Sequence, residues 1–279
     1  MDSTKVLIQL AKSDLSTSQL LYENKHYRTS YFHFQQATEK ANKAWGLLNG
    51  IIQEKDLQQN IKHNPIKIYR IILNEQEQKI KKFLNFIELN PKLRNFPIYI
   101  DVNFNDYHKS LLDSNTFFDS LYNRDLIHIP TKELSYYIFE IKKVVQTKIR
   151  FPKNFKVGFE KQIQKFLNLF DFIGTPQAIM AKNEIEKVFL NDVHQKEFFE
   201  ALKKISPQII DIGFICYTLY YCALITIRHS SLTRYPENGL NPIEIYNRKL
   251  PIIKKQPDFM GLLGKAIFKF SRLNNKLNI

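Results

Sequence analysis

Residues 10–48, LAKSDLSTSQLLYENKHYRTSYFHFQQATEKANKAWGLL, decide the fold. Their second half repeats apolar side chains every three, four or seven positions, which is the spacing of one face of an α-helix. This face consists of Tyr27, Tyr31, Phe34, Ala41, Trp45 and Leu48. A first helix is predicted at residues 4–22 and a second at residues 27–48, and only a short turn at residues 24–26 joins them. The two helices are therefore expected to pack antiparallel.

The rest of the chain is also predominantly helical in its pattern. Apolar residues recur at helical spacing in residues 65–89, 105–122, 131–149, 155–171, 176–190, 193–205 and 207–229. Helix-starting residues are expected at Thr131, Thr175 before Pro176, Asp192, and Ser206 before Pro207. Residues 96–104, FPIYIDVNF, alternate like a short strand. The sequence predicts an all-α helical bundle with at most one short extended segment near 96–104.

The charge of the chain points to an anionic partner. Forty-one Lys and Arg residues against 27 Asp and Glu residues leave a net charge of +14, which favours nucleic acid, a nucleotide or an acidic protein. The alternative is a basic surface that serves solubility alone. The only cysteines, Cys216 and Cys222, can build neither a disulfide framework nor a thiolate metal cage. A reducing, cytoplasmic setting is expected, and the N-terminus lacks the pattern of an export signal.

One apolar run has the length of a membrane span. It covers residues 209–227, IIDIGFICYTLYYCALITI. Asp211, Thr218 and Thr226 would be costly in hydrocarbon, and no second span accompanies the run. We therefore expect a fully buried central helix of the bundle and no membrane partner.

A specific motif lies in the second helix. Its letters are Gln-Gln-Ala-x-Glu-Lys-Ala-x-Lys-Ala at residues 35–44, preceded by Ala-x-x-Asp-Leu at residues 11–15. This pattern resembles the HEPN domain (higher eukaryote and prokaryote nucleotide-binding). Independently of the resemblance, the small side chains of Ala37, Ala41 and Ala44 allow another helix to approach closely. Glu39 and Lys43 lie four residues apart and can pair. Gln35, Gln36, Lys40 and Lys43 form a polar stripe, which could equally be a solvated face.

Two weaker similarities to the family set the domain boundaries. His63, in IKHNPIKIY, stands where the family often has a His-Asp-Leu element, and residues 233–239, TRYPENG, resemble its Arg-Tyr-Pro element. Together they predict HEPN-like helices in residues 1–90, a helical insertion or second subdomain in 91–205, and a core helix with a C-terminal HEPN-like element in 206–279. The alternative is a complete HEPN domain in 1–150 followed by a second helical domain in 151–279.

The resemblance implies a protein that binds a nucleotide or RNA, in a toxin–antitoxin or phage-defence setting. A homodimer and a nucleotidyltransferase-like antitoxin are the expected partners. A basic groove formed by the second helix and the C-terminal turn is expected to contact phosphate, although cations at a helix C-terminus also have a structural reason, the helix dipole. The expected binding residues are Lys40, Lys43, His63, Arg228, His229, Arg234 and Tyr235.

Active family members are metal-independent endoribonucleases that use an Arg and a His with four to six residues between them. Imidazole can move the proton of a 2′-hydroxyl, and guanidinium can stabilise charge on the phosphate. Arg124 and His128 are the nearest match, but only three residues separate them, and Asn123 stands where the arginine is expected. The sequence predicts no metal site and no cofactor. An endoribonuclease and a non-catalytic dimerisation module stay open as alternatives to a binding protein.

Overall fold

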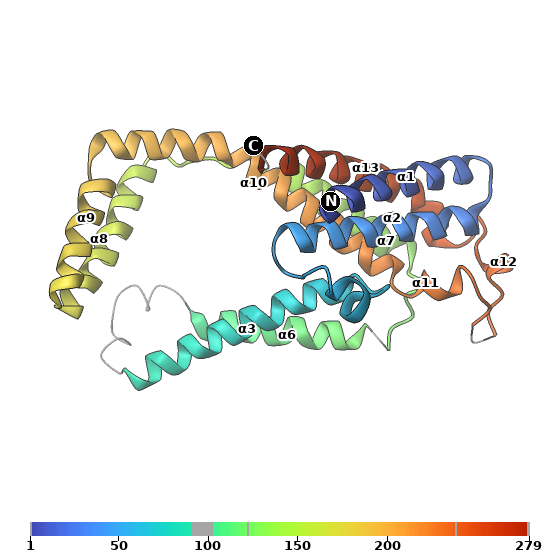
Figure 1. Cartoon of the computed structure of the whole chain (residues 1–279), viewed down its shortest axis with the longest axis horizontal. Coiled ribbons are helices and arrows are strands. Elements are labelled where there is room, and N and C mark those ends of the chain that lie inside the picture. The colour runs from blue at the N-terminus through green and yellow to red at the C-terminus, as the bar shows by residue number, and fades with distance from the viewer. Residues whose placement is uncertain (1, 91–102, 122, 238, 278–279) are drawn as a thin grey trace. The chain divides into compact units, whose positions relative to one another are not determined.

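The computed structural model describes residues 2–90, 103–121, 123–237 and 239–277, which form a helical protein (Figure 1). Within those ranges there is no β-strand, so the predicted all-α fold is confirmed. Residues 96–102 of the predicted extended segment lie outside the described ranges, and Phe104 already begins a helix. The helices are α1 (Ser3–Glu23), α2 (Tyr27–Leu48), the π-helix η1 (Leu57–Ile61), α3 (Ile66–Leu89), α6 (Phe104–Ser120), α7 (Thr131–Gln146), α8 (Phe155–Ile173), α9 (Pro176–Phe189), α10 (Asp192–Thr226), α11 (His229–Leu232), α12 (Pro242–Ile245) and α13 (Pro251–Leu277).

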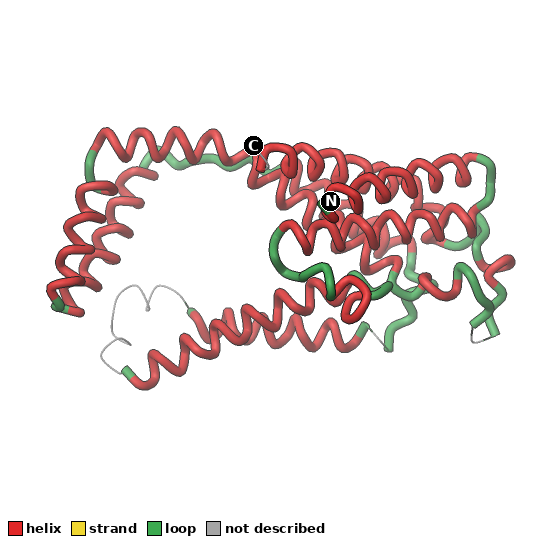
Figure 2. The backbone as a smooth tube through the Cα atoms, in the orientation of Figure 1, coloured by secondary structure: helices red, strands yellow, loops and turns green. Residues whose placement is uncertain are grey.

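The chain divides into two compact units, and the described residues of each are mostly helical (Figure 2). The first unit combines residues 1–75, 114–147 and 210–279, and the second combines residues 76–113 and 148–209. The first unit therefore brings α1, α2 and α7 together with α13 and the end of α10. The domain boundaries expected from the sequence stay predictions.

The helix pair α1–α2 forms as the sequence pattern predicts. The Asp2 carboxylate caps α1 by accepting from the backbone N–H of Thr4 at 2.9 Å. The apolar face of α2 is buried, with Tyr31 and Phe34 fully inaccessible. Ser18 and Ser30 each donate from the hydroxyl to the other's backbone carbonyl, at 2.8 and 2.7 Å, inside the contact between the helices. Small side chains thus allow the two backbones to approach while their polar groups stay satisfied.

Helix α10 corrects two predictions. Two helices were expected, 193–205 and 207–229, but a single helix of 35 residues runs through Pro207. Proline removes the N–H that would bond the carbonyl four residues earlier. The Ser206 hydroxyl donates to that carbonyl, the one of Lys203, at 2.9 Å, which replaces the missing hydrogen bond. Ser206 thus supports a continuing helix instead of starting a new one.

The apolar run within α10 is only partly buried, whereas a fully buried helix was expected. In length and composition α10 could cross a membrane, and half of its most apolar window is buried in the structure. Phe214, Ile215 and Leu219 belong to the core of the first unit, whereas Ile212 and Tyr217 are exposed. The helix therefore contributes one face to the core.

Sequence analysis missed α13. Its residues Ile253, Phe259, Leu263 and Phe270 are fully buried at helical spacing. Pro257 lies inside this helix, and Gly261 and Gly264 interrupt its apolar pattern, so breaker residues concealed the periodicity. A Cβ atom on Gly264 would lie 3.4 Å from Leu15 Cδ2, so the glycine fits the close contact between α13 and α1.

Candidate functional site

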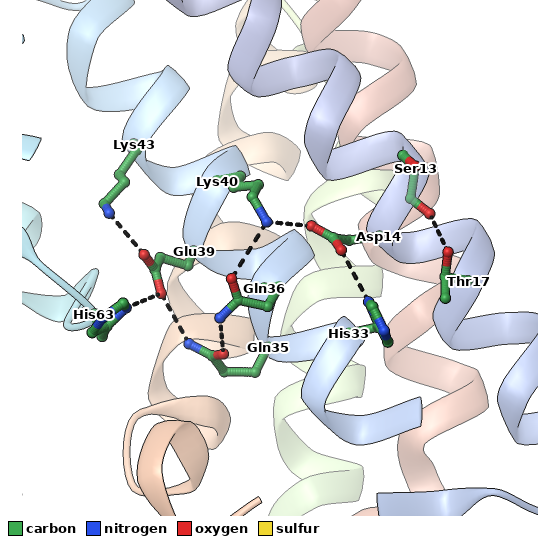
Figure 3. Close-up of polar contacts among 10 residues, drawn as sticks. All are labelled: Ser13, Asp14, Thr17, His33, Gln35, Gln36, Glu39, Lys40, Lys43 and His63. Carbon is green, nitrogen blue, oxygen red and sulfur yellow. Dashed lines mark hydrogen bonds and ion pairs between the residues drawn. The ribbon is translucent and has the colours of Figure 1, made fainter. Parts of the chain in front are cut away.

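A buried carboxylate organises the polar stripe of α2 (Figure 3). Glu39 is only 5% exposed, although its side chain is charged. Lys43 Nζ donates to Glu39 Oε1 at 2.7 Å, and Gln35 Nε2 donates to Glu39 Oε2 at 3.1 Å. His63 Nδ1, which comes from the segment after η1, lies 3.2 Å from the same Oε2. The carboxylate is thus surrounded by donors, the condition under which a charge can be buried.

A second carboxylate, Asp14 on α1, extends this arrangement. It accepts from Lys40, and His33 Nδ1 lies 3.0 Å from its Oδ1. Lys40 also donates to Gln36 Oε1 at 3.4 Å, and Gln36 donates to Gln35 Oε1 at 2.7 Å, which links the two networks. The stripe therefore joins α1 to α2 and is not simply a solvated face. Both lysines that were predicted to bind a ligand form ion pairs within the protein. Lys40 pairs with Asp14, and Lys43 pairs with Glu39.

A cavity of about 380 Å³ opens beside this network, and we call it the basic cavity. Its volume lies within the range of sites for small ligands, about 300–1,000 Å³. The wall contains three permanent cations and one histidine, and no acidic residue. It is lined by Ile61, Lys62, His63, Asn64, Lys67, Leu121, Ile227, Arg228 and Ser230.

The backbone on one side of the basic cavity has an unusual shape. The π-helix η1 ends at Ile61 and is followed by Lys62, whose φ of 50° is positive although it is not glycine. Such a conformation is costly for a residue with a Cβ, and both π-helical turns and strained residues occur often at functional sites. Lys67 Nζ donates to the Asn60 carbonyl at 2.8 Å and so holds the turn. Asn64 Oδ1 is buried and accepts no hydrogen bond from the described residues.

A second cavity, of about 300 Å³, shares Arg228 with the first. Its other wall residues are Asn123, Arg124, Asp125, Leu126, Ile127, Leu232, Glu237 and Leu240. Arg124 forms an ion pair with Glu133 at the start of α7, and Glu133 also accepts from the Tyr137 hydroxyl. The carboxylate of Glu133 therefore partly neutralises the positive charge of Arg124.

His128, the other residue of the predicted catalytic pair, is held by its own loop. Asp125 Oδ1 accepts from the backbone N–H groups of Ile127 and His128, at 2.9 and 3.1 Å. His128 Nδ1 lies 2.9 Å from Asp125 Oδ2. The imidazole is exposed and does not line the cavity that contains Arg124. The loop places both residues near the surface, each beside a carboxylate.

His229 belongs to the core, which corrects its placement in the expected binding cluster. It is fully buried, with Nδ1 2.5 Å from the Tyr246 hydroxyl and Nε2 3.3 Å from the Leu126 carbonyl. Burial lowers the pKa of His229 to about 4, so the ring is neutral at pH 7. It adjoins Arg228 in sequence, but its ring faces inward and cannot contact phosphate.

Arg234 and Tyr235 lie on the surface beyond both cavities. The guanidinium carbon of Arg234 is 6.0 Å from the ring centre of Phe32 and 5.6 Å from that of Tyr235. Arg234 Nε donates to the Ser230 carbonyl at 3.1 Å, and Tyr235 is exposed. This pair forms a small stacked group that solvent reaches.

The structure thus brings together only some of the predicted residues. His63 and Arg228 meet in the basic cavity, whereas Arg124 and Arg228 meet in the second one. Sequence analysis missed Lys62 and Lys67, although both flank the His63 motif, IKHNPIK. Among the described residues, no group of three His, Cys, Asp or Glu side chains could hold a metal ion.

Comparison with known proteins agrees with the motif in α2. The model of the HEPN domain family matches residues 4–120, which confirms the resemblance of the helix pair. A protein of Methanocaldococcus jannaschii named "Putative toxin MJ1304" is 35% identical over 83 residues, which are 30% of this chain and 52% of that protein. The chain thus matches about half the length of this relative. No solved structure matches the chain.

Proposed function

From the premise that residues 4–120 match the HEPN domain family, we propose that this toxin-like protein binds RNA or a nucleotide by its phosphate groups in the basic cavity. The observation that carries this proposal is the wall of that cavity, which combines Lys62, Lys67 and Arg228 with His63. Lysine offers a point charge to phosphate, and arginine can bind it through two parallel N–H groups. Ser230, whose hydroxyl donates to the Ile227 carbonyl at 3.4 Å, completes this side of the wall.

The charge of the whole chain supports a polyanionic ligand. A net charge of +14 raises the local concentration of nucleic acid and speeds its association. Arg228 also lines the second cavity, so a strand could place neighbouring phosphates on both sides of this side chain. We therefore favour single-stranded RNA over a mononucleotide as the ligand.

The biological setting that we propose rests on the named relative. A HEPN protein related to a toxin would act on RNA in a toxin–antitoxin or phage-defence system in the cytoplasm. A nucleotidyltransferase-like antitoxin would be its partner, and the protein would form a homodimer. We also propose that the HEPN fold is split, with its C-terminal part in residues 210–279 of the first unit.

Binding can be measured without cleavage by using a fluorescent 12-nucleotide RNA whose 2′-hydroxyl groups are all methylated. Fluorescence anisotropy at a series of salt concentrations gives the affinity and its salt dependence. The double variant Lys67→Ala with Arg228→Ala removes two cations from the basic cavity. We expect its affinity to fall about 10- to 100-fold and its salt slope to drop by about 1.4, since each phosphate contact on a single strand contributes about 0.7.

A matched control removes the same charge elsewhere. Lys81 and Lys82 are exposed on α3, in the second unit, and their double alanine variant should keep most of the affinity. Equal loss in both double variants would mean that net charge alone drives binding. Retained affinity in the Lys67 and Arg228 variant would refute the basic cavity as the binding site.

A further inference from the structure

We propose that His63 is a catalytic base for RNA cleavage in the basic cavity, and that Glu39 is the residue that positions it. This inference rests on the proposed function, because the RNA must first bind in that cavity. It assigns the chemistry to a histidine other than His128. The pair draws on two elements, α2 for Glu39 and the segment after η1 for His63.

The geometry fixes the form of the imidazole. His63 Nδ1 lies 3.2 Å from Glu39 Oε2 (Figure 3), and a carboxylate can only accept a hydrogen bond. In the neutral ring the proton therefore sits on Nδ1, which leaves the lone pair on Nε2. The His63 side chain is 61% exposed, whereas that of Glu39 is 6% exposed. One nitrogen is thus anchored to a buried charge while the ring itself stays accessible to a ligand.

Glu39 suits the role of positioning residue because it is itself held firmly. Lys43 and Gln35 occupy its two oxygens, at 2.7 and 3.1 Å. A buried carboxylate on one ring nitrogen selects the tautomer, orients the ring and stabilises the imidazolium that forms when the other nitrogen takes a proton. His63 thus pairs with a buried carboxylate, whereas Asp125, the carboxylate that pairs with His128, is exposed.

The groups that would face the phosphate lie in the same wall. Lys62 adjoins His63, and Lys67 and Arg228 also line the cavity. During cleavage the non-bridging oxygens of the phosphate gain negative charge, and cations held in the wall stabilise that charge. The costly backbone conformation of Lys62, with φ of 50°, lies directly before His63 in this wall.

The reaction needs no metal and no second reactant. His63 Nε2 takes the proton of a ribose 2′-hydroxyl, and that oxygen forms a bond to the adjacent phosphorus. The bond between phosphorus and the 5′ oxygen of the next nucleotide breaks. The proton passes from His63 to this departing oxygen, so a 2′,3′-cyclic phosphate and a 5′-hydroxyl result with no net gain or loss of protons.

The test uses the full chain with EDTA and a 12-nucleotide RNA labelled at its 5′ end. We expect cleavage products that end in a 2′,3′-cyclic phosphate, identified by mass spectrometry. His63→Ala should lower the rate about 100- to 10,000-fold, the usual contribution of a general base. Added imidazole should restore part of the lost rate. His194→Ala, which changes an exposed histidine of the second unit, should cleave like the wild type.

Glu39 needs a readout that a purely structural role would not give. Glu39→Gln keeps the size of the side chain, and its amide oxygen can still accept from one donor. We expect kcat to fall about 10- to 100-fold, while the affinity for the fully methylated RNA stays close to wild type. The thermal midpoint should fall as well, because the largely buried Lys43 loses its charged partner. Loss of affinity and stability together, with kcat unchanged, would show that Glu39 only supports the fold and would overturn its positioning role.

The same samples separate this inference from the proposed function. Wild-type binding of the methylated RNA without any cleavage of the unmodified RNA would overturn the catalytic role of His63 and leave the binding proposal standing. Failure to bind either RNA would overturn both. Cleavage that survives in His63→Ala and disappears in His128→Ala would instead place the reaction in the loop that contains Arg124.

Discussion

His229 makes a pH-dependent contribution to stability that can be measured. Burial lowers its pKa to about 4, from an ordinary value of 6.5. The unfolded chain therefore binds the proton first, and the free energy of unfolding falls as the pH drops from about 6.5 to about 4. The full difference corresponds to about 3 kcal/mol, since one pKa unit is worth about 1.4 kcal/mol. Urea denaturation of the wild type across this range should reveal the loss.

The variant His229→Gln isolates this contribution from that of the carboxylates. Glutamine cannot take up a proton in this range, so the variant should be less stable at pH 7 but show a flatter decline toward pH 4. His26→Gln, at an exposed position before α2, should keep the wild-type slope. Parallel declines in all three proteins would contradict the assignment of the slope to His229.

The contrast between His63 and His229 shows what sequence can say about single residues. Both were expected to contact a ligand. In the folded chain His63 lines a cavity, whereas the buried His229 forms a hydrogen bond with the Tyr246 hydroxyl. The link between His63 and Glu39 joins residues 24 positions apart. Helical spacing predicts neighbours within one helix, such as Glu39 and Lys43, but not contacts made after the chain turns back.

At the scale of elements, Trp45 tests how α2 anchors α13. Trp45 is 7% exposed and meets the Phe270 ring edge-on, with ring centres 5.3 Å apart. Trp45→Ala should lower the free energy of unfolding by about 3–5 kcal/mol, because a large buried ring leaves a cavity. Phe268→Ala, on α13 but at a position that is 60% exposed, should cost far less. Comparable losses in the two variants would mean that this contact does not anchor α13.

Sequence predicted elements best where pattern and capping agree. The bounds of α2 match the prediction, and Thr175 caps α9 by accepting from the Ala178 N–H at 3.2 Å. At α10, Asn191 caps one position before the expected Asp192 by accepting from the Val193 N–H at 2.9 Å. Thr131 begins α7 without a side-chain cap, after Pro130. Local signals therefore locate a helix start within about two residues, while Pro207 shows that side-chain rescue can override them.

At the scale of the whole molecule, the family match and the compact units divide the chain differently. The HEPN match covers residues 4–120, yet residues 76–113 belong to the second unit and residues 210–279 return to the first. Sequence periodicity identifies helices one at a time, and it does not indicate which of them share a core. The missed helix α13 supplies much of the core of the first unit, including Phe259, Leu263 and Phe270.

This division predicts that the two units open with different free energies. Within the second unit, α8 and α9 bury few of their described side chains, namely Leu167 and Ala178, whereas α2 buries its apolar face together with Gln35 and Glu39. Hydrogen exchange measured by mass spectrometry should therefore find amides of α8 and α9 exchanging at least about ten-fold faster than those of α2, after correction for intrinsic rates.

Helix α10 provides an internal comparison, because it belongs to both units. Its residues 192–209 lie in the second unit and residues 210–226 in the first. Since exchange follows the opening of the unit that buries each amide, protection should rise along this one helix near residue 210. Uniform protection from residue 192 to residue 226, equal to that of α2, would mean that the chain unfolds as a single cooperative body.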